Sequence, residues 1–454
     1  MKLPRILVAA PSSGTGKTLI TCGILQALVN RGLNVCSFKC GPDYIDPMFH
    51  KKVIGTHSTN IDTFFADKSV IDYLMGANGR DKDIAVFEGV MGYYDGLGGT
   101  TDKASTYEVA KTTDTPVILV INCKGMSLSV AAMINGFLKF RDDSNIKGII
   151  LNQTTEAMCK ILGKLIQDEC GIPVVGYVPK FTDCLLESRH LGLVMPDEID
   201  DLKARVHKMA RILEETLDFD LLLEIASSAN EIDENIELGD EYKYHTNKPV
   251  RIGVARDEAF CFIYHDNMRL LENMGAEIVE FSPIHDETLP DDIDGMLLYG
   301  GYPELFAREL SANKSMKDSI RDAINDGMPC MAECGGFIYL HRKFEDIDGE
   351  AYDGVGIIDA LAYRTSRLRR FGYIDLTYTS GEFAHDVGRI PAHEFHYYDS
   401  ESNGETFEAK KPIGTRSWDC IHQSSNLMAG FPHLYYYGNT LIPQIFLNKC
   451  ERYR

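Results

Sequence analysis

Eight residues near the start of the chain, Pro11–Thr18, read Pro-Ser-Ser-Gly-Thr-Gly-Lys-Thr and combine glycines with a lysine and hydroxyl groups. They follow the apolar run Ile6–Ala10 and precede a run with apolar residues at helical spacing. A strand, a glycine-bearing turn and a helix in this order direct N–H groups and the positive end of the helix dipole at one phosphate group. Lys17 would reach the outer phosphates, and the Thr18 hydroxyl would help hold a magnesium ion. The pattern predicts a nucleotide site, although the strict motif has glycine in place of Pro11.

Two further loops place acidic side chains after predicted strands. The apolar runs Val35–Phe38 and Ile84–Phe87 each lead into a loop, and ligands of parallel sheets collect at the carboxyl ends of such strands. Glu88 ends the second run, which is the position from which an acidic residue reaches magnesium in phosphate-loop enzymes. Any one carboxylate could instead be a solvated loop charge or a helix cap, but convergence on one strand edge favours metal and substrate binding. The candidate residues are Lys39, Asp43, Asp46 and Glu88.

A second chemical site is predicted in the second half of the chain, at Cys334. In the segment Met328–Ile338, apolar residues lead into Cys334 and small residues follow it, which favours the sharp strand-to-helix turn of a nucleophile elbow. The N-terminus of the following helix is expected to lower the thiol pKa and, through Gly335, to help form an oxyanion hole. Gly301, after another predicted strand, could supply the opposing N–H donor. The alternative is a buried cysteine without a catalytic role, which is our interpretation of Cys330.

A thiolate nucleophile needs a base, and three of the thirteen histidines are candidates. His433 lies in a glycine- and tyrosine-rich segment near the C-terminus, and His393 and His396 lie together in Ala-His-Glu-Phe-His-Tyr. The spacing alone does not choose among the three.

The composition is that of a soluble protein with more than one domain. At 454 residues the chain exceeds the usual size of a single core. Its formal net charge of -21 argues against nucleic acid and anionic membranes as partners, so local donors or metal ions must bind any anionic substrate. The twelve cysteines show no paired spacing for zinc, and the apolar segments are too short for a signal peptide or a membrane span. We therefore expect a cytoplasmic protein with reduced thiols.

Strand-like runs alternate with helical patterns along the first half of the chain. Val117–Ile121 and Gly148–Leu151 continue the series of strands, and helical patterns cover Val130–Phe140 and Met158–Asp168. This alternation predicts a parallel sheet covered by helices. Such a sheet would bring the phosphate loop and the acidic loops to one edge.

The chain turns polar and acidic over residues 227–248, without a sustained apolar stripe. We therefore predict a linker there, between a first domain at 1–226 and a second at 249–454. Strand-like runs then resume, and a long helical pattern over Glu304–Asp326 leads towards Cys334. The second domain is thus also predicted to be α/β.

The loop Pro11–Thr18 and the segments Phe38–Pro47 and Phe87–Gly92 together resemble cobyrinic acid a,c-diamide synthases. This family shares its nucleotide domain with dethiobiotin synthetases, and its members tolerate a residue other than glycine at the start of the phosphate loop. The stretch Glu187–Leu193 is similar to the family as well. The resemblance implies an ATP site formed by Ser13, Gly14, Thr15, Gly16, Lys17 and Thr18, with Asn152 near the base.

The resemblance also implies roles for the residues of the acidic loops, with ATP and Mg2+ as cofactors. The synthetase site would be lined by Lys39, Asp43, Tyr44, Asp46 and Asp95. The Mg2+ ion would be held by Thr18, Asp46 and Glu88.

The segments Tyr299–Glu304 and Ala332–Gly336, with the late His433, are similar to the class I glutamine amidotransferase domain of this family. In that arrangement a cysteine, here Cys334, attacks the side-chain amide of glutamine and His433 transfers the proton. Many class I amidotransferases have a glutamate two residues beyond the histidine, where this chain has Tyr435, so the third triad member stays open.

The fold implied by the resemblance is two doubly wound α/β domains, a dethiobiotin-synthetase-like phosphate-loop domain and a flavodoxin-like amidotransferase domain. The stretch His393–His396 also matches the family, and it would lie where the two domains and the tetrapyrrole meet, unless its role is structural. Because ammonia must reach the synthetase site without loss to bulk water, we expect the Cys334 elbow to face the phosphate-loop edge.

The activity implied is amidation of the a and c acetate carboxylates of cobyrinic acid in cobalamin biosynthesis, through an acyl phosphate and ammonia from glutamine. Hydrogenobyrinic acid and nickel-sirohydrochlorin are alternative substrates, and a phosphate-loop ATPase switch acting on a protein partner is a non-enzymatic alternative. The partners expected are ATP, glutamine and a tetrapyrrole polycarboxylate, and a homodimer is a possible assembly.

Overall fold

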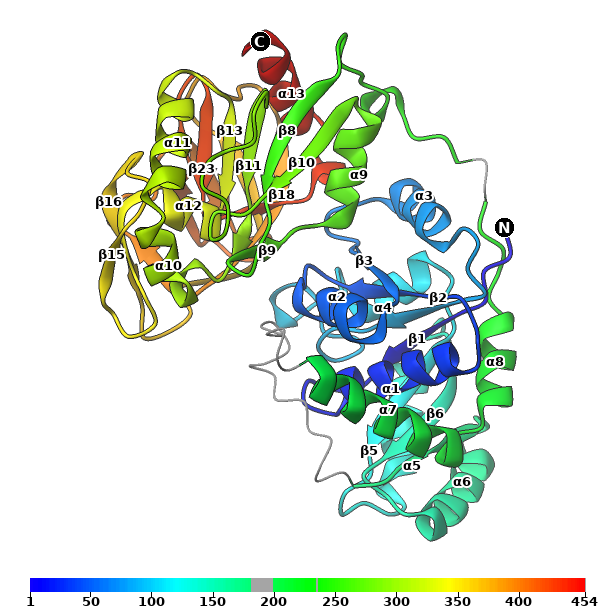
Figure 1. Ribbon diagram of the computed structural model, residues 1–454. Helices are drawn as coiled ribbons and strands as arrows, with labels where there is room; N and C mark the ends of the chain where they lie inside the picture. Colours follow the sequence, from blue (N-terminus) through cyan, green and yellow to red (C-terminus); the bar gives the residue numbers. More distant parts are fainter. Residues whose placement is uncertain (181–198, 234–235, 454) are drawn as a thin grey trace. The chain divides into compact units, whose positions relative to one another are not determined.

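The computed structural model describes residues 1–180, 199–233 and 236–453. The chain divides into two compact units, Met1–Glu237 and Leu238–Arg454, each with its own sheets and hydrophobic core (Figure 1). This division falls inside 227–248, whose bounds as a linker stay a prediction. The stretch Glu187–Leu193 lies outside the described residues.

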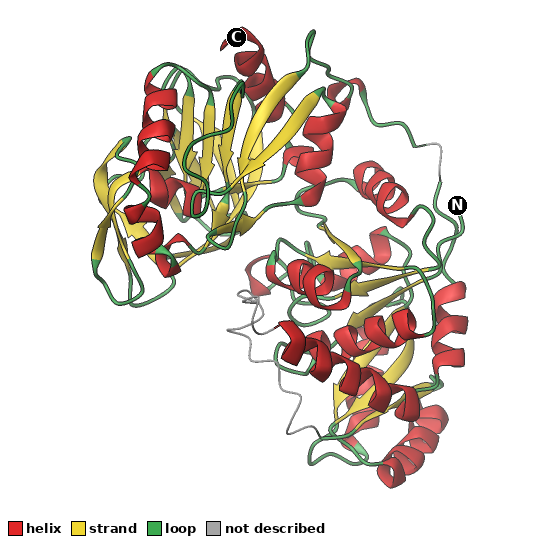
Figure 2. Cartoon of the chain, in the orientation of Figure 1, coloured by secondary structure: helices red, strands yellow, loops and turns green. Residues whose placement is uncertain are grey.

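Unit 1 is built on a seven-stranded parallel sheet of order β3-β2-β4-β1-β5-β6-β7. Figure 2 shows its strands in yellow and the helices around them in red. Its strands are rich in β-branched and other apolar residues, and the central ones are buried along their whole length. Because the strands are parallel, the loops after β1, β2, β4 and β6 all begin at the same edge. The bounds are β1 Arg5–Ala9, β2 Val35–Cys40, β3 His57–Ile61, β4 Ile84–Glu88, β5 Val117–Asn122, β6 Ile146–Asn152 and β7 Val174–Val178.

The helices of unit 1 alternate with these strands, and the first of them is buried on nearly every side. Helix α1 carries the phosphate loop at its start and is covered by α7. At Gly23 a Cβ atom would lie 2.6 Å from side-chain atoms of Leu213 and Met209, so glycine lets the two helices approach closely. The bounds are α1 Lys17–Asn30, α2 Ile45–Phe49, a π-helix at His50–Ile54, α3 Lys68–Gly79, α4 Thr106–Thr112, α5 Ser129–Phe140, α6 Glu156–Cys170, α7 Ile199–Thr216 and α8 Phe219–Ser227.

Unit 2 contains a six-stranded sheet of order β10-β8-β11-β13-β23-β22. Its first five strands pair in parallel, and the sequence rank of these strands runs 2-1-3-4-5, which is the flavodoxin-like doubly wound order. The bounds are β8 Val250–Ala255, β10 Ala276–Phe281, β11 Gly295–Leu298, β13 Cys330–Glu333, β22 His422–Gln423 and β23 Leu427–Gly430. The helices are α9 His265–Asn273, α10 Ala307–Ala312, α11 Lys314–Asn325, α12 Gly335–Leu340 and α13 Leu441–Tyr453.

Unit 2 also carries mainly antiparallel strands in smaller sheets. One sheet has the order β15-β14-β16-β19, another β21-β20-β17-β18-β24, and β9 pairs with β12. The bounds are β9 Phe260–Phe262, β12 Gly300–Gly301, β14 His341–Glu345, β15 Ala351–Asp353, β16 Ile358–Arg364, β17 Arg370–Tyr378, β18 Arg389–His396, β19 Tyr398–Ser400, β20 Phe407–Lys410, β21 Ser417–Cys420 and β24 His433–Leu434.

The predicted fold class is confirmed, since both units contain a doubly wound parallel sheet. The antiparallel sheets of unit 2 are an addition that the sequence did not predict. Among the described helices, none is both long and apolar enough to cross a membrane.

Candidate active sites

The phosphate loop connects β1 to α1, and two left-handed glycines give it its shape. Gly14 has φ 74° and Gly16 has φ 94°, values that residues with a Cβ atom rarely adopt. The Lys17 ammonium donates to the carbonyl oxygens of Ser12, at 3.1 Å, and Met91, at 2.5 Å, so it lies over the loop. Burial, together with the nearby Lys39, lowers the pKa of Lys17 to about 8 and outweighs the opposite effect of Glu88, Asp95 and Asp46.

Asn152 supports the phosphate loop from the end of β6. Its side-chain amide donates to the carbonyl oxygen of Thr15 at 2.7 Å, and a Cβ atom on Gly16 would lie 2.8 Å from the same amide nitrogen. The Thr15 hydroxyl donates in turn to the Ser12 carbonyl oxygen. Asn152 therefore lies against the loop itself, and the position near the nucleotide base stays a prediction.

A buried cluster of charges lies at the carboxyl ends of β2 and β4. The Lys39 ammonium contacts the carboxylates of Asp46 and Glu88, the latter at 3.0 Å, and Thr18 donates to the same Glu88 oxygen at 2.6 Å. All of these groups except Thr18 are buried. Removing one partner of such a buried ion pair typically costs about 3–5 kcal/mol, because the other charge stays behind without compensation.

The pKa shifts in this cluster follow from burial and from the short distances between the charges. Burial disfavours the ammonium of Lys39, yet Asp46 and Glu88 raise its pKa well above the ordinary value. Burial alone would raise the pKa of Glu88, but Lys39 and the nearby His50 imidazole hold it below the ordinary value. Burial and the neighbouring Glu88 carboxylate raise the pKa of Asp46. The cluster therefore holds Lys39 as a cation, with Glu88 as the more acidic carboxylate.

His50 joins this cluster, although no motif in the sequence indicates it. Its Nε2 lies 3.2 Å from Oε2 of Glu88, and its Nδ1 lies 3.1 Å from the Ser37 hydroxyl. His50 is completely buried in the π-helix after α2. The imidazole thus holds the Glu88 carboxylate from one side while Thr18 and Lys39 contact its other oxygen.

The remaining predicted residues of this site lie in the loops around the cluster. Asp43 accepts from the backbone N–H of Ile45 at 2.7 Å and lies 3.9 Å from the Lys39 ammonium, so it starts α2 as well as adding negative charge. Tyr44 is buried and precedes α2. Asp95 accepts from the backbone N–H of Gly92 at 3.0 Å, which shapes the loop after β4.

The donor set at this edge fits a magnesium ion bound together with phosphate. Within the described residues no group of three or more His, Cys, Asp or Glu side chains forms a ready-made metal site. Mg2+ does not require one, because one or two carboxylates, substrate phosphates and water usually complete its coordination. The Thr18 hydroxyl and the Glu88 and Asp46 carboxylates form such a partial set, with Lys39 supplying the compensating positive charge.

Cys334 lies on a strained turn between β13 and α12. Its φ of 47° and ψ of -101° belong to a region that residues other than glycine rarely adopt, as at a nucleophile elbow. A Cβ atom on Gly336 would lie 2.0 Å from the carbonyl oxygen of Leu298, so the residue after the turn has no room for a side chain. The predicted elbow is therefore present in the structure.

Several backbone groups converge on this elbow. The backbone N–H of Cys334 donates to the Gly430 carbonyl oxygen at 2.8 Å, three residues before His433. A Cβ atom on Gly335 would lie 3.0 Å from the Gly301 nitrogen, and one on Gly300 would lie 2.5 Å from Cε1 of His433. The two glycines predicted for the oxyanion hole are thus neighbours, and His433 lies beside them.

The three candidate histidines occupy different environments. His393 stacks on His433 with ring centroids 4.9 Å apart, whereas His396 stacks on Phe431 and contacts the Glu394 carboxylate at 2.8 Å. Burial, followed by the charges of His393 and His396, lowers the pKa of His433 well below its ordinary value. A neutral His433 at neutral pH is ready to accept a proton.

The expectation of a lowered thiol pKa at Cys334 is wrong. Burial raises the pKa of the Cys334 thiol, and the carboxylates of Glu304 and Glu394 raise it further. The hydrogen bond at the start of α12 acts in the expected direction but is outweighed. The thiol therefore depends on a base to become a nucleophile.

Both units match families of known function. Residues 6–193 match the CobQ/CobB/MinD/ParA nucleotide binding domain, and residues 251–440 match the CobB/CobQ-like glutamine amidotransferase domain. A nucleotide-binding domain and an amidotransferase domain in one chain define a glutamine-dependent amide ligase.

Relatives over the full length make the family clear. The cobyrinate a,c-diamide synthase of Picrophilus torridus is 39% identical over 99% of this chain and 99% of its own length. That of Priestia megaterium is 36% identical over 98% of this chain and 97% of its own length. The chain belongs to the cobyrinate a,c-diamide synthase family.

Proposed function

We propose that the protein amidates the a and c acetate carboxylates of cobyrinic acid, using ATP and glutamine, in cobalamin biosynthesis. The observation that carries this proposal is the presence, in one chain, of the Cys334 elbow and of a phosphate loop beside the Lys39–Glu88 cluster. Full-length similarity to cobyrinate a,c-diamide synthases supports the choice of substrate.

In the synthetase reaction, a substrate carboxylate attacks the terminal phosphorus of ATP and ADP leaves, which forms an acyl phosphate. The loop N–H groups and the Lys17 ammonium would stabilise the charge on the phosphoryl group being transferred. Lys39 balances the charge of Glu88 and Asp46 next to the incoming carboxylate. Mg2+, held by Thr18, Glu88 and Asp46, would supply charge neutralisation to the phosphates when bound. Ammonia then attacks the acyl carbon and phosphate leaves.

In the glutaminase reaction, His433 takes the proton of the Cys334 thiol, and the thiolate attacks the side-chain carbonyl of glutamine. The backbone N–H groups of Gly301 and Gly335 would stabilise the oxyanion. The protonated His433 then donates its proton to the departing nitrogen, which leaves as ammonia. Water hydrolyses the remaining thioester to glutamate and restores the thiol.

The division of labour between the two sites gives the first test, with purified protein, cobyrinic acid and ATP. Cys334→Ala should abolish amidation with glutamine and leave amidation with added ammonia within about twofold of the wild type, because ammonia bypasses the thiolate. Lys17→Ala should abolish both, while glutamine hydrolysis persists. Unchanged glutamine-dependent amidation in Cys334→Ala would contradict the proposal.

The substrate is tested with a panel of tetrapyrroles, read by mass spectrometry. Gain of two amides on cobyrinic acid supports the proposal, and preference for nickel-sirohydrochlorin or hydrogenobyrinic acid would keep the mechanism but change the pathway. We further propose Mg2+ dependence, a cytoplasmic location and small-molecule partners only, with assembly as a homodimer to be measured by light scattering.

A further inference from the structure

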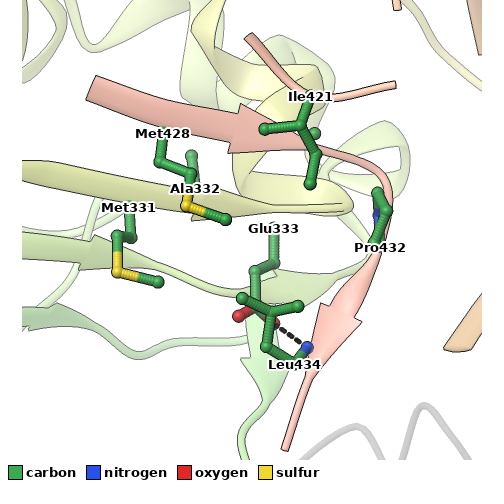
Figure 3. A pocket seen from close by; sticks show the side chains of 8 residues that line it. Met331, Ala332, Glu333, Ile421, Met428, Pro432 and Leu434 are labelled. Atoms are coloured by element: carbon green, nitrogen blue, oxygen red, sulfur yellow. Dashed lines mark hydrogen bonds between the residues drawn. The ribbon is translucent and has the colours of Figure 1, made fainter. Parts of the chain in front are cut away.

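Glu333, the residue directly before Cys334, lies with its carboxylate beside His433. It ends β13, where it pairs with Gly430 of β23, and its side chain is almost completely buried. Its Oε2 lies 3.7 Å from Nδ1 of His433 and accepts from the backbone N–H of Leu434 at 3.4 Å, the hydrogen bond drawn in Figure 3. A carboxylate is thus next to Nδ1 of the His433 ring.

The surroundings of this carboxylate are mostly apolar, as Figure 3 shows. A small cavity beside it is lined by Met331, Ala332, Ile421, Met428, Pro432 and Leu434. Oε1 of Glu333 has no hydrogen-bond partner among the described residues, and burial raises the pKa of the carboxyl group to about 8. An incompletely paired buried carboxylate disfavours the folded state, so a contribution to chemistry would explain its presence.

The other contacts of His433 place its ring beside His393 and Gly300. Stacking on His393, with the rings 18° from parallel, fixes the plane of the imidazole. A Cβ atom on Gly300 would lie 2.5 Å from Cε1 and 3.4 Å from Nδ1 of His433, and Nδ1 also lies 3.7 Å from Oε2 of Glu333. Position 435, where many class I amidotransferases have a glutamate, holds a tyrosine whose hydroxyl lies 3.5 Å from Asp266.

We propose that Glu333 is the positioning residue of His433 and acts as the third member of the triad; this inference rests on the proposed glutaminase reaction. The ionised carboxylate accepts the Nδ1 proton of His433, which leaves the lone pair of Nε2 available for the thiol proton. When His433 takes that proton, the negative charge of Glu333 stabilises the imidazolium. The proton leaves again on ammonia, so Glu333 itself gains and loses no proton over the cycle.

The test is glutamine hydrolysis without tetrapyrrole, which reads the amidotransferase site alone. Glu333→Gln should lower kcat by about 100-fold or more while KM for glutamine changes only a few-fold, because the amide keeps the shape but not the charge. Ammonia-dependent amidation should stay within about twofold. Asp266→Asn is the matched control, since it neutralises another buried carboxylate that contacts Tyr435.

The pH profile separates positioning from a structural role. Glu333 is faced by His433, Tyr299 and Tyr436, while His393 and His396 act on His433, and Glu304 and Glu394 act on Cys334. In the wild type, kcat/KM for glutamine hydrolysis should fall at acid pH as Glu333 becomes protonated. In Glu333→Gln this acid limb of the profile should occur at lower pH, and the maximal kcat/KM should be lower. Glu333→Asp should restore part of the activity together with the original limb.

Three results would overturn the proposal. The first is an unchanged kcat and acid limb in Glu333→Gln, and the second is a similar loss in Asp266→Asn. The third is equal loss of ammonia-dependent amidation in Glu333→Gln, which would show a structural role. Glutamine hydrolysis needs no tetrapyrrole. The test of Glu333 therefore stays valid even if cobyrinic acid is not the substrate.

Discussion

His50 gives the first prediction at the scale of single residues. It contacts Oε2 of Glu88, while Thr18 and Lys39 contact Oε1. In His50→Ala the Glu88 carboxylate loses a partner that holds its orientation. We therefore expect Mg2+ to bind about 10- to 100-fold more weakly during ATP-driven amidation, which is the range typical for residues behind a metal ligand. The measurement is the Mg2+ concentration that gives half-maximal rate with ammonia as nitrogen donor.

His57→Gln is the control for this experiment. His57 lies on the neighbouring strand β3 and contacts the Asn78 side chain at 2.7 Å, away from Glu88. An equal increase in both variants would mean that the loss comes from the fold of this edge and not from Glu88.

Glu333 gives a second prediction, on stability. Its folded-state pKa of about 8 lies above the ordinary value of 4.5. The protonated form therefore contributes fully to the free energy of unfolding below about pH 4.5, and this contribution is lost as the pH rises through 8. Glu333→Gln does not titrate, so relative to the wild type its free energy of unfolding should rise between pH 5 and 9, by on the order of a few kcal/mol at about 1.4 kcal/mol per pKa unit. Urea unfolding at pH 6 and pH 9 measures this; parallel pH dependences would contradict it.

The sequence could predict residues with a motif, but not those defined only by tertiary contact. Cys334 and Lys17 lie in motifs whose local spacing sets their geometry. His50 and Glu333 reach Glu88 and His433 across long stretches of chain, so no local pattern indicates them. The prediction of a lowered pKa for the Cys334 thiol was wrong for a similar reason. A helix N-terminus can be predicted from the sequence, whereas the burial that raises this pKa depends on tertiary contacts.

At the scale of elements, the predicted strands of unit 1 were correct in place but short at their ends. Ile84–Phe87 extends in the structure to Glu88, and Gly148–Leu151 extends to Asn152. An apolar run stops where the polar functional residue begins, although the strand continues through it. Strand β3 was not predicted, since His57–Ile61 at the sheet edge is largely polar.

The turn into α12 gives a prediction at this scale. Gly336→Ala places a Cβ atom against the Leu298 carbonyl oxygen, where backbone cannot yield cheaply, so we expect a loss of about 3 kcal/mol or more in stability. Glutamine hydrolysis should fall with it, because the elbow is displaced. Gly76→Ala in α3 is the control, since nothing lies within 4 Å of its added methyl group and alanine favours helix. A Gly336→Ala protein as stable and active as Gly76→Ala would contradict the packing argument.

At the scale of the whole molecule, the chain has two separate cores and a single tryptophan. Trp418 lies in β21 of unit 2, so its fluorescence reports the unfolding of that unit alone. ATP binds the folded phosphate loop of unit 1 and should raise the unfolding midpoint seen by circular dichroism more than the midpoint seen by Trp418 fluorescence. Lys17→Ala should remove the shift. An equal shift in both signals would mean that the units unfold together.

The architecture of unit 2 marks the limit of prediction at this scale. The α/β alternation indicated the doubly wound sheet, but the antiparallel strands between α12 and β23 depend on long-range pairing that has no local periodic signal of comparable strength. One of these strands, β18, carries His393 and pairs with β24, which carries His433. The added sheet is thus part of the framework around His433.

The burial of the Cys334 thiol has a consequence for its reaction with oxidants and electrophiles. Hydrogen peroxide and electrophiles react with thiolates. A thiol whose pKa is raised by burial forms almost no thiolate at neutral pH. We therefore expect the Cys334 thiol to react slowly with such reagents in the resting protein. If His433 withdraws its proton only when glutamine is bound, as proposed, reagents shaped like glutamine should inactivate the protein far faster than small alkylating agents of equal intrinsic reactivity.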